Sequence, residues 1–209
     1  TTGNEGVAAV TANILPEILK KYDSISYSLE GEQQEQGDNL KSIGKNFLLA
    51  MIVVYILLAI PFNSYFQPLV VMSSIPFGLT GAVIGHLLLG LNFSVLSMMG
   101  IVALTGVVVN DSLVMVDFIN RYRSEGNTIK EAVLEAGPRR FRPIFLTSLT
   151  TFVGLVPLLL EKSTQAQFMI PMAVSLAFGV VFATVITLLL VPVSYLILEK
   201  YILKTERVI

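Results

Sequence analysis

The chain has 209 residues, of which 54% are hydrophobic and 14% are charged, and its formal net charge is -1. Soluble domains rarely reach such values, so the composition indicates a membrane protein with several spanning helices. The near-zero net charge gives no indication of nucleic-acid binding. The absence of cysteine excludes disulfides and thiolate metal sites, and the single histidine, His86, cannot form a zinc site alone. We expect no cofactor.

The first 40 residues are polar and look like a soluble segment. Residues 7–22 carry apolar side chains at helical spacing, and residues 24–31 alternate apolar and polar side chains as a short strand does. One helix and one strand cannot bury a core of their own. We therefore interpret residues 1–40 as the end of a larger α+β domain outside the membrane; a self-contained extramembrane tail is the alternative.

Five long apolar segments follow, each close to or above the ~20 residues that a helix needs to cross ~30 Å of hydrocarbon. Their uniform apolarity excludes the alternating strands of a membrane barrel. The sequence therefore predicts a mainly α membrane protein with five transmembrane helices. The predicted bundle covers residues 41–198, with helices over about 41–62, 69–91, 94–119, 143–160 and 168–198.

The connection between the third and fourth segments is predicted to hold a further helix. Residues 127–137 have Asn127 as a candidate N-cap, an apolar stripe, and Gly137-Pro138 as a stop. Because the surrounding residues are basic, this pattern indicates a helix lying along the membrane surface. Residues 199–209 then form a polar tail after the last span.

Positive charges gather on one side of the predicted bundle. The connection between the third and fourth segments and the tail after the fifth hold most of them: Arg121, Arg123, Lys130, Arg139, Arg140, Arg142, Lys200, Lys204 and Arg207. The turns on the opposite side contain a single cation, Lys162. Because cytoplasmic loops carry the excess of lysine and arginine, we expect a cytoplasmic C-terminus and an N-terminal segment on the outer side.

The third segment carries two adjacent polar residues, Asn110 and Asp111, near its middle. A carboxylate at the bilayer centre costs at least ~2.5–3.5 kcal/mol on insertion scales, so such a residue usually faces a bundle interior or a water path. The low dielectric favours the neutral form of the carboxyl group. Asp111 is therefore a candidate proton carrier; a protonated carboxyl group that only joins two helices by a hydrogen bond is the alternative.

Asp117 and Thr151 are secondary candidates for the proton relay, although both have simpler explanations. Asn110 and Asp117 share one stripe of the third segment, but Asp117 precedes Arg121 by four residues and is expected to form an interfacial ion pair. Thr147 and Thr151 share a face of the fourth segment, where each hydroxyl can also bond its own backbone.

Small residues recur at intervals of four in two segments and predict close helix packing. The second segment contains Gly81 and Gly85, and the fifth contains Ser175, Gly179 and Ala183. A hinge or a substrate path is the functional alternative for such a stripe. Packing is the better interpretation, because small residues at this spacing are common in membrane helices.

Two long stretches resemble the resistance–nodulation–division (RND) multidrug exporters, in particular their hydrophobe/amphiphile efflux branch. They are GIVALTGVVVNDSLVMVDFINRYR, residues 100–123, and EAVLEAGPRRFRPIFLTSLTTFVGLVPLLL, residues 131–160. The stretches SLEGEQQEQ and LLAIPFNSYFQPLVVMSSIPFGLTGAVIGHLLLG match the same family, so the resemblance covers essentially the whole chain.

The resemblance implies a C-terminal fragment: the last five helices of the second half, preceded by the end of a periplasmic porter-like α+β domain over residues 1–40. Thr1 is not a methionine, which agrees with a processed or partial chain. The family functions as a homotrimer in the bacterial inner membrane, with a periplasmic adaptor and an outer-membrane channel. It is a proton antiporter rather than an enzyme, and it exports hydrophobic or amphiphilic compounds across the Gram-negative envelope. Membrane lipids and the missing N-terminal half are further expected partners.

The resemblance also implies a proton relay whose acids lie in the missing half. The position of the family's relay lysine is occupied by Asn110, and the asparagine that follows it in the family is Asp111 here. The relay threonine falls on Thr147, and an arginine of the proton pathway falls on Arg140. Since the lysine is absent and an acid stands one residue later, the coupling arrangement is expected to differ from the family pattern.

Two other functions compete with a drug exporter. A related carrier of the superfamily moves lipids or metal ions, although the methionines Met98, Met99, Met169 and Met172 look like packing residues at segment ends. In a helical membrane module without transport activity, the polar residues would only hold helices together. An intramembrane protease is excluded, because the sequence has neither a Ser–His nor a paired-Asp constellation at one level.

Overall fold

The computed structural model describes residues 10–16, 18 and 32–200. The chain forms two compact units, residues 1–39 and 40–209. In the first unit the described residues include a π-helical turn, Val10–Ile14, which covers part of the helix predicted over residues 7–22. The strand predicted over residues 24–31 lies outside the described residues.

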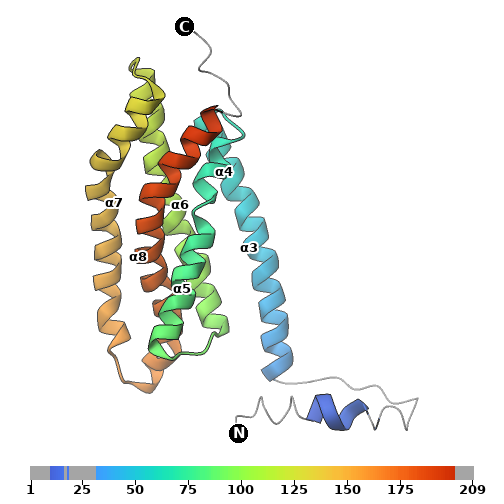
Figure 1. The fold of residues 1–209 in the computed structure, drawn as a ribbon. Helices are drawn as coiled ribbons and strands as arrows, with labels where there is room; N and C mark the ends of the chain where they lie inside the picture. Colours follow the sequence, from blue (N-terminus) through green and yellow to red (C-terminus); the bar gives the residue numbers. More distant parts are fainter. Residues whose placement is uncertain (1–9, 17, 19–31, 201–209) are drawn as a thin grey trace. The chain divides into compact units, whose positions relative to one another are not determined.

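The second unit is built from long apolar helices, and the described part of the chain contains no strand. Among the described residues, five helical segments are long and apolar enough to cross a membrane, which confirms the five predicted spans. Figure 1 shows their order along the chain. The helices are α3 (Glu32–Phe62), α4 (Gln67–Met72), α5 (Ile75–Leu89), α6 (Val95–Ser124), α7 (Ile129–Leu159) and α8 (Thr164–Leu198).

The second span, expected as one helix over 69–91, is broken into α4 and α5 at Ser73 and Ser74. Pro76 follows the break, and a proline can neither donate a backbone hydrogen bond nor leave room for the carbonyl one turn earlier. The backbone N–H groups of Phe77 and Gly78 bond to the Ser74 carbonyl instead, at 3.2 and 3.4 Å. The proline therefore starts a new helix at this position.

The fourth span differs from the prediction. We expected a surface helix over 127–137 that stops at Gly137-Pro138 and a separate span over 143–160, but α7 is continuous through Pro138 and Pro143. A proline inside a helix costs ~3 kcal/mol, so packing must hold the helix together. Side chains on both sides of Pro138 do so, because Val133, Ala136 and Ile144 belong to the same buried cluster.

The N-terminal ends of α6 and α7 are fixed by capping boxes. Ser94 caps α6 reciprocally with Ser97, and Thr128 caps α7 reciprocally with Glu131. The cap of α7 is thus Thr128 and not Asn127, whose side-chain amide donates to the Tyr122 carbonyl at 2.9 Å. Each box satisfies backbone N–H groups that the first helical turn leaves unpaired.

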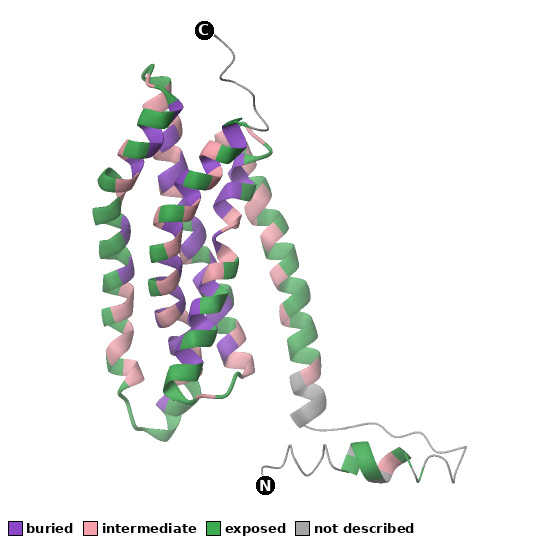
Figure 2. Ribbon diagram, viewed as in Figure 1, coloured by how far each residue is buried: buried purple, intermediate pink, exposed green. Residues whose placement is uncertain are grey.

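Helix α8 lies at the centre of the bundle and packs against α5, α6 and α7. Figure 2 shows that the buried residues follow the facing sides of these helices. Helix α3 behaves differently: Leu58 is the one buried residue in its described part, and it packs with Val54 and Phe62 against the cluster that contains Val71. The remaining apolar surface of α3 is open in this chain.

Glycines on α5 bring this helix close to α8. A Cβ atom on Gly81 would lie 2.5 Å from Phe182 Cβ and 2.8 Å from the Phe178 carbonyl oxygen. A Cβ atom on Gly85 would lie 2.6 Å from Phe178 Cβ. Real Cβ atoms do not approach other atoms so closely, so any larger residue at either position forces the two helices apart.

We predict that Gly81→Ala lowers the stability of the purified protein by about 1–3 kcal/mol, because the added methyl group meets backbone of α8. Thermal unfolding in detergent measures this change. Gly154→Ala on α7 is the matched control, since a Cβ atom there has nothing within 4 Å. It is expected to leave stability unchanged or to raise it by up to ~1 kcal/mol through helix propensity. Equal melting temperatures for Gly81→Ala and wild type would contradict the close contact.

Candidate functional site

The two polar residues at the middle of α6 point in different directions. The side chain of Asp111 is buried, with 5% of its surface exposed, whereas Asn110 is exposed. Consecutive residues of a helix lie about 100° apart, so one can face the bundle while the other faces an uncovered side. Asp111 is thus the polar residue of this pair that the five helices enclose.

The carboxyl group of Asp111 interacts with the hydroxyl group of Thr147 on α7. Thr147 Oγ1 also donates a hydrogen bond to the Ile144 carbonyl of its own helix, at 2.8 Å. A hydroxyl group has one proton to donate and two lone pairs that accept. The Thr147 hydroxyl group therefore contacts both the Ile144 carbonyl of its own helix and the Asp111 carboxyl group of α6.

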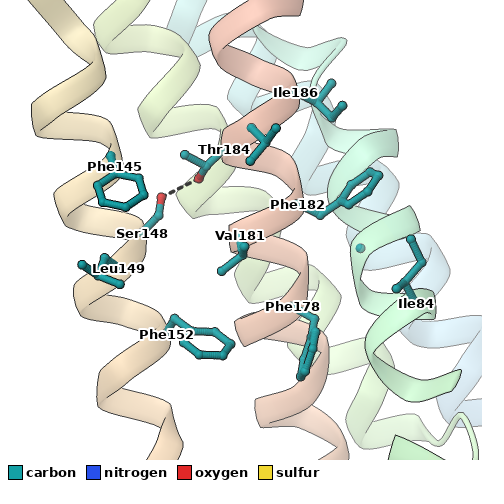
Figure 3. Close-up of a pocket in the computed structure, with 12 residues that line it drawn as sticks. Ile84, Phe145, Ser148, Leu149, Phe152, Phe178, Val181, Phe182, Thr184 and Ile186 are labelled. Atoms are coloured by element: carbon teal, nitrogen blue, oxygen red, sulfur yellow. Dashed lines mark hydrogen bonds between the residues drawn. The ribbon is translucent and has the colours of Figure 1, made fainter. Parts of the chain in front are cut away.

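Hydroxyl groups beside these two residues join α6 and α7 to their neighbours. Ser112 Oγ lies 3.0 Å from Ser74 Oγ, at the break between α4 and α5, and 2.9 Å from the Val108 carbonyl oxygen. Ser148 Oγ lies 2.5 Å from Thr184 Oγ1 on α8 (Figure 3). The residues that follow Asp111 and Thr147 in the chain therefore connect α6 to the α4–α5 break and α7 to α8.

The sequence did not predict the hydrogen bonds of Ser74, Ser112 or Thr184. Ser112 directly follows Asp111 in an otherwise apolar helix, and this adjacency could have indicated it. No local pattern pairs Ser148 with Thr184, because the contact joins residues that are 36 positions apart.

The remaining relay candidates lie in other surroundings. Asp117 pairs with Arg121 at 2.5 Å, as their spacing predicts, and this pair is exposed. Thr151 donates to the Thr147 carbonyl of its own helix at 2.9 Å. The guanidinium carbon of Arg140 lies 4.9 Å from the centre of the Phe118 ring, and Arg140 Nε is buried without a hydrogen-bond partner among the described residues. Thr147 is thus the candidate that reaches Asp111.

A polar cluster that the sequence did not reveal joins α4, α6 and α8 at the end of the bundle away from His86. The hydroxyl group of Tyr195 donates to Asn120 Oδ1 at 2.6 Å, and Gln67 Nε2 lies 3.2 Å from both of these oxygens. Beside it Arg123 and the buried Glu199 form an ion pair at 2.9 Å. The hydrogen-bonded partners in this cluster are 53 to 128 positions apart in the sequence, so only folding brings them together.

The expected packing residues of α8 lie against α5 and α6. A Cβ atom on Gly179 would collide with Leu104 Cδ2 and lie 3.1 Å from the Gly78 carbonyl oxygen. Ser175 and Ala183 are buried, and a Cβ atom on Gly100 of α6 would lie 2.9 Å from Ser175 Cβ. These small residues let α8 approach two helices at once.

His86 lies near the opposite end of the bundle and is 3% exposed. Its Nδ1 atom lies 2.9 Å from the Ala82 carbonyl oxygen, and its Nε2 atom lies 2.8 Å from Ser97 Oγ. A carbonyl oxygen only accepts, so Nδ1 carries a proton, and Nε2 can accept from the serine. The ring therefore holds the end of α5 to the start of α6, as expected for a hydrogen-bonded histidine.

Together, the five spanning helices and the enclosed carboxyl group define a polytopic α-helical membrane protein. The chain belongs to the AcrB/AcrD/AcrF family, whose sequence model matches residues 5–199. This membership confirms the resemblance to RND exporters. The hydrophobe/amphiphile branch stays a prediction.

Two curated relatives illustrate the match. The chain is 33% identical over 201 residues to the "Swarming motility protein SwrC" of Bacillus subtilis (strain 168), covering 95% of this chain and 19% of that protein. It is 36% identical over 154 residues to the "Multidrug resistance protein MdtC" of Erwinia tasmaniensis, covering 73% of this chain and 15% of that protein. The chain thus spans less than a fifth of the length of these relatives.

Solved structures share the fold. A crystal structure of a heavy metal efflux pump (crystal form I) superposes with a TM-score of 0.73 at 25% sequence identity, over 90% of this chain and 20% of that one. Crystal form II gives a TM-score of 0.74 at 24% identity, over 89% and 19%. The helices of this chain are therefore arranged as in about a fifth of the chain of that pump.

We predict that Tyr195→Phe lowers the stability of the purified protein by about 1–3 kcal/mol, because the buried Gln67 and the half-buried Asn120 lose a hydrogen-bond partner. Tyr55→Phe is the control, since its hydroxyl bond to the Tyr65 carbonyl is exposed and water can replace that partner. Thermal unfolding in detergent compares the two variants. An equal shift for both would show that the cluster of Gln67, Asn120 and Tyr195 has no special part in stability.

Proposed function

We propose that the chain is the C-terminal membrane part of a proton-driven exporter, in which Asp111 gains and loses the proton. The observation that carries this proposal is the burial of a carboxyl group against Thr147, inside a bundle of apolar helices. An ionised carboxylate in such a place costs at least ~2.5–3.5 kcal/mol, so protonation strongly changes the energy of the site. Membership of an efflux transporter family supports the same function.

The hydrogen bonds of Thr147 explain how protonation can alter the contact between α6 and α7. A protonated Asp111 donates to Thr147 Oγ1 while Thr147 keeps its own bond to the Ile144 carbonyl. An ionised Asp111 only accepts, so Thr147 must turn its proton away from Ile144 and toward the carboxylate. Each protonation state thus requires a different hydroxyl orientation, and α7 passes the difference to α8 through Ser148 and Thr184.

Asn110 and Arg140 complete the proposed pathway. Asn110 replaces the relay lysine of the family pattern and lies on an exposed side of α6. We assign this side to contacts with the N-terminal half of the transporter, which carries the acids of the family relay. Arg140 lies at the end of the bundle near the α6–α7 connection and is proposed to guide protons at the cytoplasmic side.

The proposal extends to the complete transporter as the family resemblance implies it. The full protein is proposed to lie in the bacterial inner membrane with the C-terminus in the cytoplasm, and to act as a homotrimer with a periplasmic adaptor and an outer-membrane channel. Its proposed substrates are hydrophobic or amphiphilic compounds. Similarity to a protein named for multidrug resistance supports this substrate class.

Export of metal ions is the second candidate, because the similar solved structures are those of a heavy metal efflux pump. Among the described residues, however, no group of three or more His, Cys, Asp or Glu side chains could hold a metal ion. Growth of a strain that expresses the full-length protein, in the presence of amphiphilic dyes or of metal salts, separates the two substrate classes.

We predict that Asp111→Asn in the full-length protein abolishes proton-driven efflux while it spares assembly. An asparagine has nearly the same shape but cannot exchange a proton, so the helices still pack. Efflux of a fluorescent amphiphile from energised cells measures transport, and size-exclusion chromatography of the purified protein measures assembly.

Asp117→Asn is the matched control, because the exposed Asp117–Arg121 pair is expected to contribute little. This variant is expected to transport at nearly the wild-type rate. Wild-type efflux by Asp111→Asn would contradict the proposed role of Asp111. Wild-type efflux after substitution of both Asp111 and Thr147 would show that these residues only hold α6 and α7 together.

A further inference from the structure

A groove of about 500 Å³ opens on the bundle surface between α5, α7 and α8. Figure 3 shows its walls: Phe145, Leu149 and Phe152 come from α7, Phe178 and Val181 come from α8, and Ile84 comes from α5. The exposed fractions of Phe145, Leu149 and Val181 are 47%, 43% and 41%, so the groove is open along its length. Its size lies within the usual range of small-molecule pockets, ~300–1,000 Å³.

The groove offers no free polar group to an occupant. Its two hydroxyl groups, on Ser148 and Thr184, bond to each other at 2.5 Å. Each also lies within hydrogen-bond distance of a carbonyl oxygen of its own helix, Ile144 for Ser148 and Val180 for Thr184. An occupant that needs polar partners inside the groove therefore finds none, and the lining suits a hydrocarbon chain.

The positively charged Arg142 lies on α7, three residues before the lining residue Phe145. Arg142 precedes Leu149 by seven residues and therefore lies within about 20° of it around α7. Arg142 is exposed and makes no hydrogen bond or ion pair with any described residue. Arg139, one turn earlier on the same helix, is already paired with Glu135 at 2.8 Å.

The distance from Arg142 to the far end of the groove matches one leaflet of a bilayer. Ten residues separate Arg142 from Phe152, which corresponds to about 15 Å along a helix. The hydrocarbon core of a bilayer is about 30 Å thick, so this length is about half of it. With Arg142 at the level of the lipid headgroups, the apolar groove therefore extends along α7 to about the bilayer midplane.

We propose that this groove binds one acyl chain of an anionic phospholipid, with Arg142 holding the phosphate of its headgroup. The lipid fills the space between α7 and α8 beside the hydrogen bond between Ser148 and Thr184. It therefore steadies α7 against α8 at this level. The groove shares Ser148 and Thr184 with the proposed response of α7 to Asp111, but lipid binding itself does not depend on proton transport.

Native mass spectrometry of the full-length protein in detergent tests the site, with phosphatidylglycerol as the probe and phosphatidylcholine as the neutral comparison. Arg142→Gln is expected to weaken phosphatidylglycerol binding about fivefold, the effect of one cation near a membrane surface. Leu149→Trp is expected to fill the groove, so that each protomer retains one phosphatidylglycerol molecule fewer than wild type.

Two variants of the same helix control for charge and bulk. Arg139→Gln removes an equal charge from a paired arginine, and Leu146→Trp adds equal bulk at an exposed position outside the groove. Both are expected to bind phosphatidylglycerol as wild type does. Size-exclusion profiles check folding, and Val181→Phe replaces Leu149→Trp if that variant does not fold.

Wild-type phosphatidylglycerol binding by both Arg142→Gln and the groove-filling variant would overturn the proposal. The same holds if Arg139→Gln weakens binding as much as Arg142→Gln, because the effect would then be that of general surface charge. If another segment of the full-length protein occupies the groove, the groove-filling variant disturbs assembly without any change in lipid count, and the lipid assignment is wrong.

Discussion

The close approach of α8 to α5 and α6 is the contact on which the rest of the bundle depends. Within lipid the hydrophobic effect does not drive helices together, so van der Waals contact between closely spaced backbones must do so. Because Gly81 and Gly85 have no side chain, residues of α8 pack directly against the backbone of α5. In the same way, Gly179 leaves room on α8 for the side chain of Leu104 of α6. With α8 fixed on two sides, Thr184 has a defined position from which to meet α7.

Helix α7 is held to the bundle by different means. Its first turns pack through Ile129 and Val133 into the main buried cluster, but its second half has an open position at Gly154, where a Cβ atom would touch nothing. Between these regions, hydroxyl contacts to α6 and α8 connect the helix to its neighbours. The looser packing of this half leaves space for the groove.

Several other polar groups of the bundle are paired and position helices. The cluster of Gln67, Asn120 and Tyr195 connects three helices at one end, and His86 connects α5 to α6 at the other. Because an unpaired polar group in a low-dielectric interior is costly, paired clusters fix the register of the helices that carry them. In the proposed function, Asp111 differs from these groups in that its contact with Thr147 changes with protonation.

The sequence by itself determined the helical class, the five spans and the position of the unusual acid, because length, apolarity and a lone charge are local properties. It also placed the Asp117–Arg121 pair, whose partners are four residues apart. Only the tertiary structure decided that Asp111 is enclosed while Asn110 is exposed, and that α7 continues through Pro138. These outcomes depend on which neighbouring helix covers each face. Such contacts join residues distant in the chain, and no periodicity within a single helix encodes them.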